Sequence, residues 1–121
     1  MKLWYSNSSP YARKARAVVQ YHQLQDHVEL LLTTSGLDKN SPHNLDNPLG
    51  RLPALQRENG EWLYNSSLIA EYLDNIGTQP SLYGNKEARW EILRLHYLAD
   101  GILENEISVA PEKCLRPQKQ W

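Results

Sequence analysis

The apolar and polar positions predict alternating strands and helices in the first third of the chain. The first apolar run favours a strand over residues 2 to 6, which a polar cluster ends. A helix over residues 10 to 23 is predicted next, because Ser9 is a good N-cap, Pro10 suits a first helical position and apolar residues recur three or four apart. The run from His27 to Leu32 is too short for a helix and is predicted to be a buried strand parallel to the first. Together these elements make a βαβ unit.

A polar connection, a hairpin and a second helix follow this unit. Residues 33 to 47 are rich in Thr, Ser, Gly, Asp and Asn, so we expect an irregular connection with at most a short helix. Two apolar runs, 52 to 57 and 61 to 64, flank an Asn-Gly pair, which is a strong hairpin signal. After a capping cluster at 65 to 67, the apolar residues trace one face of a helix that ends near Gly77.

The pattern changes after this helix and predicts a domain boundary. Residues 1 to 77 form the first domain, and residues 78 to 84, which contain Pro, Ser and Gly, read as a linker. A long amphipathic helix is predicted from about 86 to 109, stopped by Pro111. One helix cannot build a core of its own, so residues 85 to 121 are expected either to pack on the first domain or to begin a larger helical domain.

Composition and charge narrow the class of protein. The 13 Lys and Arg nearly balance the 14 Asp and Glu, so no long-range positive field would attract nucleic acid or anionic lipid. Apolar runs are far shorter than the ~20 residues of a membrane span, and the N-terminus lacks the apolar stretch of a signal peptide, so a cytoplasmic protein is expected. The single cysteine, Cys114, allows no internal disulfide and is expected to be a bystander. The histidines lack metal-ligand spacing, so no metal site is expected.

Four segments in this order carry a family resemblance: residues 6 to 14 (SNSSPYARK), 47 to 55 (NPLGRLPAL), 64 to 73 (YNSSLIAEYL) and 98 to 102 (LADGI). With them the chain resembles a cytosolic glutathione S-transferase of the serine-type, bacterial-like kind, over residues 1 to about 117. The resemblance implies an α/β fold, with a thioredoxin-like N-terminal domain followed by the first part of the all-α C-terminal domain of that family.

The first of these segments offers a hydroxyl at the amino end of a helix, where N–H groups and the helix dipole favour negative charge. Lowering a thiol pKa of ~8.5 by about two units requires ~2.7 kcal/mol, within reach of a charge-assisted hydrogen bond plus a helix end. The resemblance implies that Ser9 is the catalytic residue that holds the glutathione thiolate. Ser8 and Tyr11 are alternatives for this role, and Ser9 could instead only cap the helix.

The resemblance also implies residues that bind the rest of glutathione. A cis bond between Leu52 and Pro53 would expose the backbone N–H and C=O of Leu52 to the peptide ligand, whereas an ordinary trans proline at a strand edge would not. Arg51 could meet the glycine carboxylate or be a solvated surface residue. Asn65 and Ser66 would bind the γ-glutamyl end, or form a plain capping cluster. Asn65 departs from the Glu or Asp usual in the family.

The expected function is therefore that of an enzyme, a glutathione transferase that activates the glutathione thiol for attack on a small electrophile. Glutathione is a co-substrate, no other cofactor is expected, and a homodimer is the expected assembly. The alternative is a non-catalytic, glutathione-transferase-like module for protein interaction. A thiol-disulfide oxidoreductase is disfavoured, because no cysteine lies near the first helix.

Overall fold

A computed structural model describes residues 1–34, 38–115 and 118, without the side chains of residues 112, 114 and 115. The Cys114 side chain, predicted to be a bystander, therefore lies outside the described residues. The chain divides into two compact units, Met1–Leu82 and Tyr83–Trp121, which are described separately.

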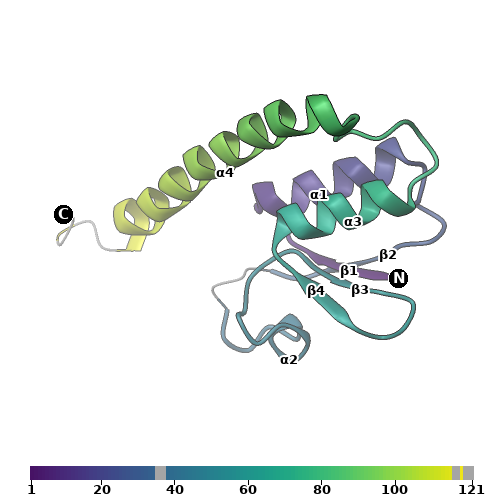
Figure 1. Ribbon diagram of the computed structural model, residues 1–121. Helices are drawn as coiled ribbons and strands as arrows, with labels where there is room; N and C mark the ends of the chain where they lie inside the picture. The colour runs from purple at the N-terminus through teal and green to yellow at the C-terminus, as the bar shows by residue number, and fades with distance from the viewer. Residues whose placement is uncertain (35–37, 116–117, 119–121) are drawn as a thin grey trace. The chain divides into compact units, whose positions relative to one another are not determined.

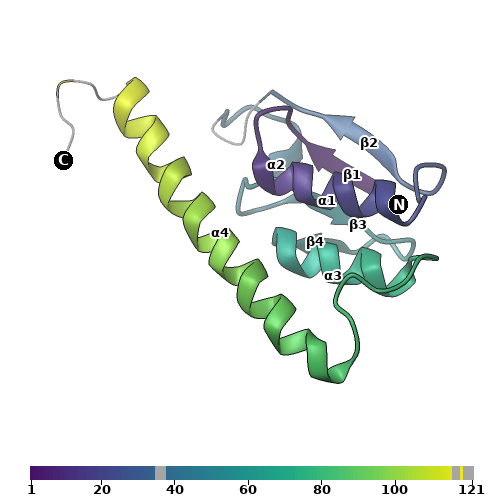
Figure 2. The same ribbon diagram turned by 90° about the horizontal axis from the view of Figure 1, so that it is seen from above.

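The first unit is a four-stranded sheet with helices on both sides. Its elements in chain order are β1 (Lys2–Tyr5), α1 (Pro10–Tyr21), β2 (Glu29–Leu32), α2 (His43–Asp46), β3 (Ala54–Gln56), β4 (Trp62–Tyr64) and α3 (Ser66–Ile76). The strand order is β2-β1-β3-β4, with β1 parallel to β2 and antiparallel to β3. Helices α1 and α3 lie side by side on one face, and α2 lies on the other (Figures 1 and 2). The predicted thioredoxin-like α/β fold is confirmed.

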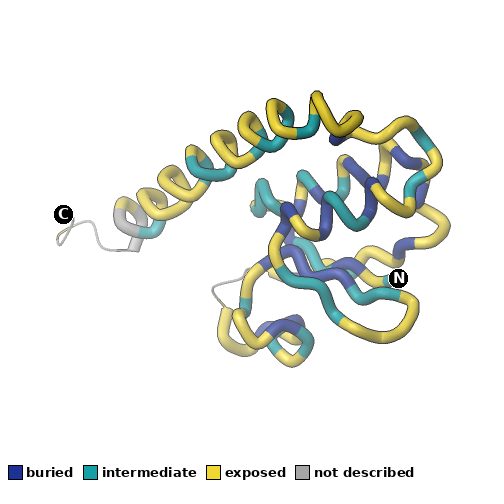
Figure 3. The backbone as a smooth tube through the Cα atoms, viewed as in Figure 1, coloured by how far each residue is buried: buried dark blue, intermediate teal, exposed yellow. Residues whose placement is uncertain are grey.

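The core lies between the sheet and the inner faces of α1 and α3, where Figure 3 shows most of the buried positions. Its helical members recur at the spacing that the sequence showed, because residues three and four apart share one face. The buried apolar residues of this cluster are Leu3, Ala15, Val18, Val19, Leu24, Val28, Leu55, Ile69, Ala70 and Leu73.

Strand β2 exists where the sequence predicts it, but the prediction that it is buried is wrong. Val28, just before the strand, is buried, whereas Leu30 and Leu32 are 43% and 57% exposed. The reason is topological: β2 is the outer strand of the sheet, next to β1 alone. An apolar run predicts an extended segment but does not reveal whether it occupies the centre or the edge of a sheet.

The hairpin and the polar connection agree with the sequence prediction. The turn between β3 and β4 places Gly60 at φ +87°, and the Arg57 N–H donates to the Glu61 carbonyl over 2.8 Å. A glycine adopts this left-handed conformation without the steric cost of a side chain. Within the described part of the connection after β2, the four-residue helix α2 is the only helix.

The second unit is built on α4 (Lys86–Leu115). Asn85, just before the helix, caps it, because its side chain accepts from the Ala88 N–H over 3.0 Å. The predicted stop at Pro111 is wrong, because the helix continues past it to Leu115. Proline removes one helical N–H and disfavours helix, but it does not prevent the residues after it from keeping helical angles. None of the helices in the described residues is long and apolar enough to cross a membrane.

Candidate functional site

The register of the sheet brings three predicted segments to one edge. Trp4 pairs with Ala54 and Ala54 pairs with Tyr64, so these three residues form one row across β1, β3 and β4. The segment to Ser9 leaves β1 just after this row, and the pair Leu52–Pro53 enters β3 just before it. Asn65 and Ser66 leave β4 there too. Residues far apart in the sequence therefore converge at the carboxyl end of β1.

Ser9 is the N-cap of α1, as predicted. Its backbone is extended, at φ −78° and ψ 114°, and its Oγ accepts from the Ala12 N–H over 3.1 Å. Pro10 occupies the first turn, where a missing N–H costs nothing. The half-buried Ser9 hydroxyl uses its oxygen for the cap, which leaves its own hydrogen available to an acceptor. Capping the helix and donating to a thiolate are thus compatible roles for one hydroxyl.

The two alternatives to Ser9 have other surroundings. Ser8 is exposed, and its hydroxyl lies 3.5 Å from that of Ser6, which is buried. Tyr11 is half-buried in the first turn of α1, and the Lys14 ammonium lies 5.9 Å from the centre of its ring. Of the three, Ser9 is the residue whose hydroxyl sits at the N-cap of α1.

The Leu52–Pro53 peptide bond is cis, which confirms that prediction. Both residues are buried, whereas Arg51 just before them is exposed. Within the described residues, neither the N–H nor the C=O of Leu52 has a hydrogen-bond partner. An extended peptide ligand could pair with these groups as a further strand would.

The start of α3 provides the third part of the site. Asn65 has a positive φ of 76°, and its Oδ1 accepts from the backbone N–H of Ser67 over 2.8 Å and of Leu68 over 3.4 Å. Asparagine tolerates positive φ better than most residues, which fits this position. Ser66 and Ser67 are buried. The sequence reasoning missed Lys14, whose ammonium donates to the Ser67 hydroxyl over 3.2 Å and so links α1 to α3.

The electrostatics of this edge favour anions. The amino ends of α1 and α3 both lie there, and neither helix has an acidic residue in its first turn. Unpaired N–H groups and the helix dipole place partial positive charge at such ends. Lys14 and Arg51 add cationic side chains. No group of three or more His, Cys, Asp or Glu in the described residues could hold a metal ion.

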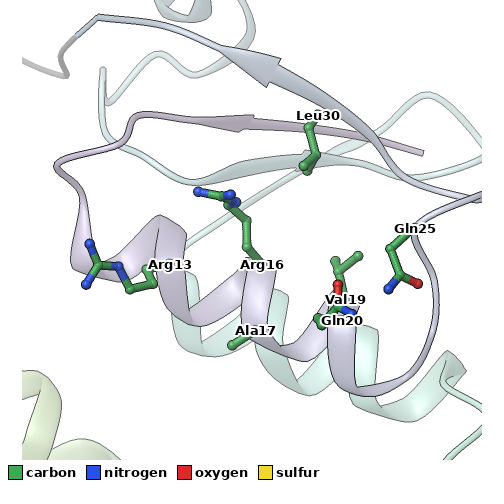
Figure 4. Close-up of a pocket in the computed structure, with 7 residues that line it drawn as sticks. All are labelled: Arg13, Arg16, Ala17, Val19, Gln20, Gln25 and Leu30. Carbon is green, nitrogen blue, oxygen red and sulfur yellow. The ribbon is translucent and has the colours of Figure 1, made fainter.

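A separate open hollow of about 390 Å³ runs along α1 beside β2 (Figure 4). It is lined by Arg13, Arg16, Ala17, Val19, Gln20, Gln25 and Leu30. The Arg16 guanidinium lies 4.5 Å from the centre of the Tyr5 ring, so this cation packs on an aromatic face. None of the residues predicted to bind glutathione lines the hollow, so it is a different surface from the candidate site.

Comparison with known proteins shows the family to which this chain is similar. The family model described as glutathione S-transferase, N-terminal domain, matches residues 8–76. A glutathione transferase family member from Pseudomonas fluorescens Pf-5, solved with bound glutathione, is 37% identical with a TM-score of 0.89. The match covers 99% of this chain and 60% of that one.

Two further relatives agree with this result. A glutathione S-transferase from Methylobacillus flagellatus KT, solved with glutathione bound, is 34% identical with a TM-score of 0.82, and the match covers 97% of this chain and 56% of that one. The uncharacterized GST-like protein YibF of Escherichia coli (strain K12) is 29% identical, over 99% of this chain and 58% of its own length. The chain therefore spans somewhat less than two thirds of the length of these relatives.

Proposed function

The chain belongs to the glutathione S-transferase family, and on that premise we propose that its first unit binds glutathione and activates the thiol for attack on an electrophile. The observation that carries this proposal is the convergence of the α1 cap, the cis Leu52–Pro53 bond and the start of α3 at one edge of the sheet. Relatives of similar fold were solved with glutathione bound.

In the proposed complex the glutathione thiolate lies at the amino end of α1, where Ser9 donates its hydroxyl hydrogen to the sulfur. The oxygen of the same hydroxyl remains the helix cap through Ala12. A charge-assisted hydrogen bond of ~1.5 to 3 kcal/mol, together with the helix end, is enough to lower a thiol pKa by one to two units. The thiolate is the nucleophile, so this shift raises the reactive fraction at neutral pH.

The other parts of glutathione match the remaining groups of the site. The backbone of Leu52 pairs with the cysteinyl residue, and Arg51 meets the glycine carboxylate. The γ-glutamyl carboxylate binds at the start of α3, where Ser66 supplies its hydroxyl and its backbone N–H, beside the N–H groups of Ser67 and Leu68 that Asn65 caps. Asn65 offers the γ-glutamyl ammonium only an amide oxygen that already accepts from Ser67 and Leu68, and it does not give the ion pair that an acidic residue would give.

Asn65 also favours a second candidate function, a non-catalytic module for protein interaction. The side chain is exposed, and its oxygen already accepts two backbone N–H groups. A site without a carboxylate here would hold glutathione less tightly. The two functions differ in a simple observable, since only the first requires glutathione binding.

Retention on immobilised glutathione tests this proposal. The wild-type chain should be retained and eluted by free glutathione, and Ser9→Ala should also be retained. In solution, the ultraviolet absorbance of bound thiolate at neutral pH should be present with the wild type and reduced in Ser9→Ala. Absence of retention of the wild type would favour the interaction module, and an unchanged thiolate signal would move the role to Ser8 or Tyr11.

We further propose that α4 forms protein contacts in a homodimer. Several large apolar side chains of α4 are exposed, namely Trp90, Leu95, Tyr97, Leu98, Ile102, Ile107 and Val109. Exposed apolar side chains gathered on one helix are typical of interaction sites. Sedimentation of the 121-residue chain should show self-association and a hydrophobic dye should bind it, whereas a compact monomer that binds no dye would contradict the proposal.

A further inference from the structure

A network of buried hydrogen bonds joins residues of the connection between β2 and β3. His43, in α2, is fully buried, and Ser41 and Thr33 are nearly so. The Ser41 hydroxyl contacts both the Thr33 hydroxyl and His43 Nδ1, the latter at 2.5 Å. On the other side of the ring, Nε2 lies 3.0 Å from the Gly50 carbonyl oxygen.

The Gly50 carbonyl determines which atom donates in each hydrogen bond of this network. A carbonyl can only accept, so the hydrogen lies on Nε2 of His43 and is donated to Gly50. Nδ1 then accepts from the Ser41 hydroxyl, and the Ser41 oxygen accepts from Thr33. Every polar atom along the path has a partner, which is the condition under which buried polar groups hold a definite geometry.

Asn47, just after α2, forms a second set of buried hydrogen bonds. It is fully buried, and its Nδ2 donates to the Arg51 carbonyl over 2.7 Å while its Oδ1 accepts from the Leu49 N–H over 2.9 Å. Its own carbonyl accepts from the Gly50 N–H over 2.9 Å. Gly50 has φ +62°, and a Cβ there would lie 3.0 Å from the Asn44 side-chain oxygen, so glycine suits this tight turn.

The hydrogen bonds of His43 and Asn47 hold the two peptide units on either side of Arg51. The Gly50 carbonyl, held by His43, shares a planar peptide unit with the Arg51 N–H. The Arg51 carbonyl, held by Asn47, shares the next unit with the Leu52 N–H. Fixing both planes fixes the backbone angles of Arg51. They in turn set where its side chain leaves the backbone and where the Leu52 N–H points.

We propose that His43 is a positioning residue for the glycyl side of glutathione, acting through Gly50 on Arg51; this inference rests on the proposed glutathione binding. Without the Nε2 hydrogen bond, the turn at Gly50 samples other orientations. A ligand that binds one orientation then loses affinity in proportion to the population of that orientation. The residue itself is buried and touches no ligand.

His43→Phe and His43→Gln separate this role from simple packing. Phenylalanine fills the ring volume but makes neither hydrogen bond, whereas glutamine can still donate from its side-chain amide to the Gly50 carbonyl. We expect His43→Phe to weaken glutathione binding about tenfold, and His43→Gln to stay within about threefold of the wild type. Leu45→Ala, in the same helix at a 91% exposed position, is the control and should bind as the wild type does.

The ligand γ-glutamylcysteine, which lacks the glycine, supplies a readout that a merely structural role would not move. Calorimetry should give the dissociation constants of both ligands for each variant. In His43→Phe the preference for glutathione over γ-glutamylcysteine should fall, because the contact with Arg51 is the one disturbed. Combining Arg51→Ala with His43→Phe should add little to the loss caused by Arg51→Ala alone.

The outcomes distinguish this inference from the function on which it rests. If the wild type binds no glutathione, both are overturned. If the wild type binds, but His43→Phe keeps the same affinity and the same ligand preference, only the role of His43 is overturned. Should His43→Phe fail to fold, Ser41→Ala decides: it removes the donor to Nδ1 and should produce a smaller loss of the same kind, whereas unchanged preference would contradict the inference.

Discussion

Two histidines in the first unit are completely buried, and they contact different kinds of polar group. His22 caps the carboxyl end of α1 and contacts a carboxylate, since its Nε2 lies 2.9 Å from Asp74 Oδ1. His43 contacts a hydroxyl and a backbone carbonyl and stands next to the candidate site. Two histidines with the same burial thus belong to different networks, one that contains a carboxylate and one made of hydroxyl groups and a backbone carbonyl.

The network around His22 fastens the segment after α3 to the end of α1. The Gln79 N–H donates to His22 Nδ1 over 3.2 Å, so Nε2 carries the hydrogen donated to Asp74. The same carboxylate accepts from the Ser81 hydroxyl over 2.6 Å and from the Leu82 N–H over 2.7 Å. The partners of a buried histidine, rather than its burial, therefore determine what it holds in place. His22 joins the segment after α3 to the end of α1, and His43 joins α2 to Gly50.

The largest expected effect comes from a steric clash with the His22 ring. A Cβ added at Gly77 would lie 2.1 Å from Nδ1 of the His22 ring, and that ring is fully buried and cannot move aside. We expect Gly77→Ala to lower the free energy of unfolding by about 3 kcal/mol or more. Urea unfolding measures it, with Gly101→Ala as the control, since nothing lies within 4 Å of a Cβ there. Equal stability of Gly77→Ala and the wild type would contradict this packing.

A smaller effect should follow from removing the charge that distinguishes the His22 network. Burial raises the pKa of Asp74, but the hydrogen bonds from Ser81, Leu82 and His22 outweigh it and leave the pKa below its usual value of 3.8. We expect Asp74→Asn to cost about 2 kcal/mol at pH 7, because charge-assisted bonds become neutral ones.

The pH dependence of this variant has a definite sign. A carboxyl with a lowered pKa in the folded state stabilises the fold above its unfolded pKa, and that stabilisation is lost as the pH falls through the folded pKa. The difference in unfolding free energy between wild type and Asp74→Asn should therefore be constant near neutrality and shrink below about pH 4. A difference that grows on acidification would show that the network is held by something other than this carboxylate.

The sequence predicted elements whose signals are local and missed contacts that join distant segments. The α1 cap and the hairpin turn follow from neighbouring residues, so Ser9 and Gly60 were found in their expected roles. His22 and Asp74 are 52 positions apart, and Lys14 and Ser67 are 53 apart. No spacing rule connects such pairs before the fold is known.

Within the candidate site, the cis bond at Pro53 could be predicted through the family resemblance, but the support behind it could not. From the sequence alone, His43 and the other histidines show only their spacing, which does not fit a metal site. Its actual partners are a hydroxyl and a main-chain carbonyl, and the latter carries no sequence signature. The edge position of β2 was missed for a similar reason, since strand order is set by the whole sheet.

A still smaller effect should come from Asn65→Asp, in the candidate site. An aspartate can keep the cap to Ser67, and its charge suits the helix end and adds a contact to the γ-glutamyl ammonium. Because the position is exposed, solvent screening limits the gain to about 1 kcal/mol, roughly fivefold in the dissociation constant for glutathione. Calorimetry checks it, and weaker binding by the variant would mean that the γ-glutamyl end lies elsewhere.

We expect glutathione to bind where the cap of α1, Leu52 and the start of α3 converge, and an amide NMR titration of the wild-type chain with glutathione locates the bound ligand residue by residue. Saturating shifts are predicted for Leu52, Ser66 and the first turn of α1. Amides near Gly77, beside the fully buried His22, should stay unchanged. Shifts confined to the hollow lined by Arg16, Gln20 and Leu30, or no shifts at all, would contradict binding at this place.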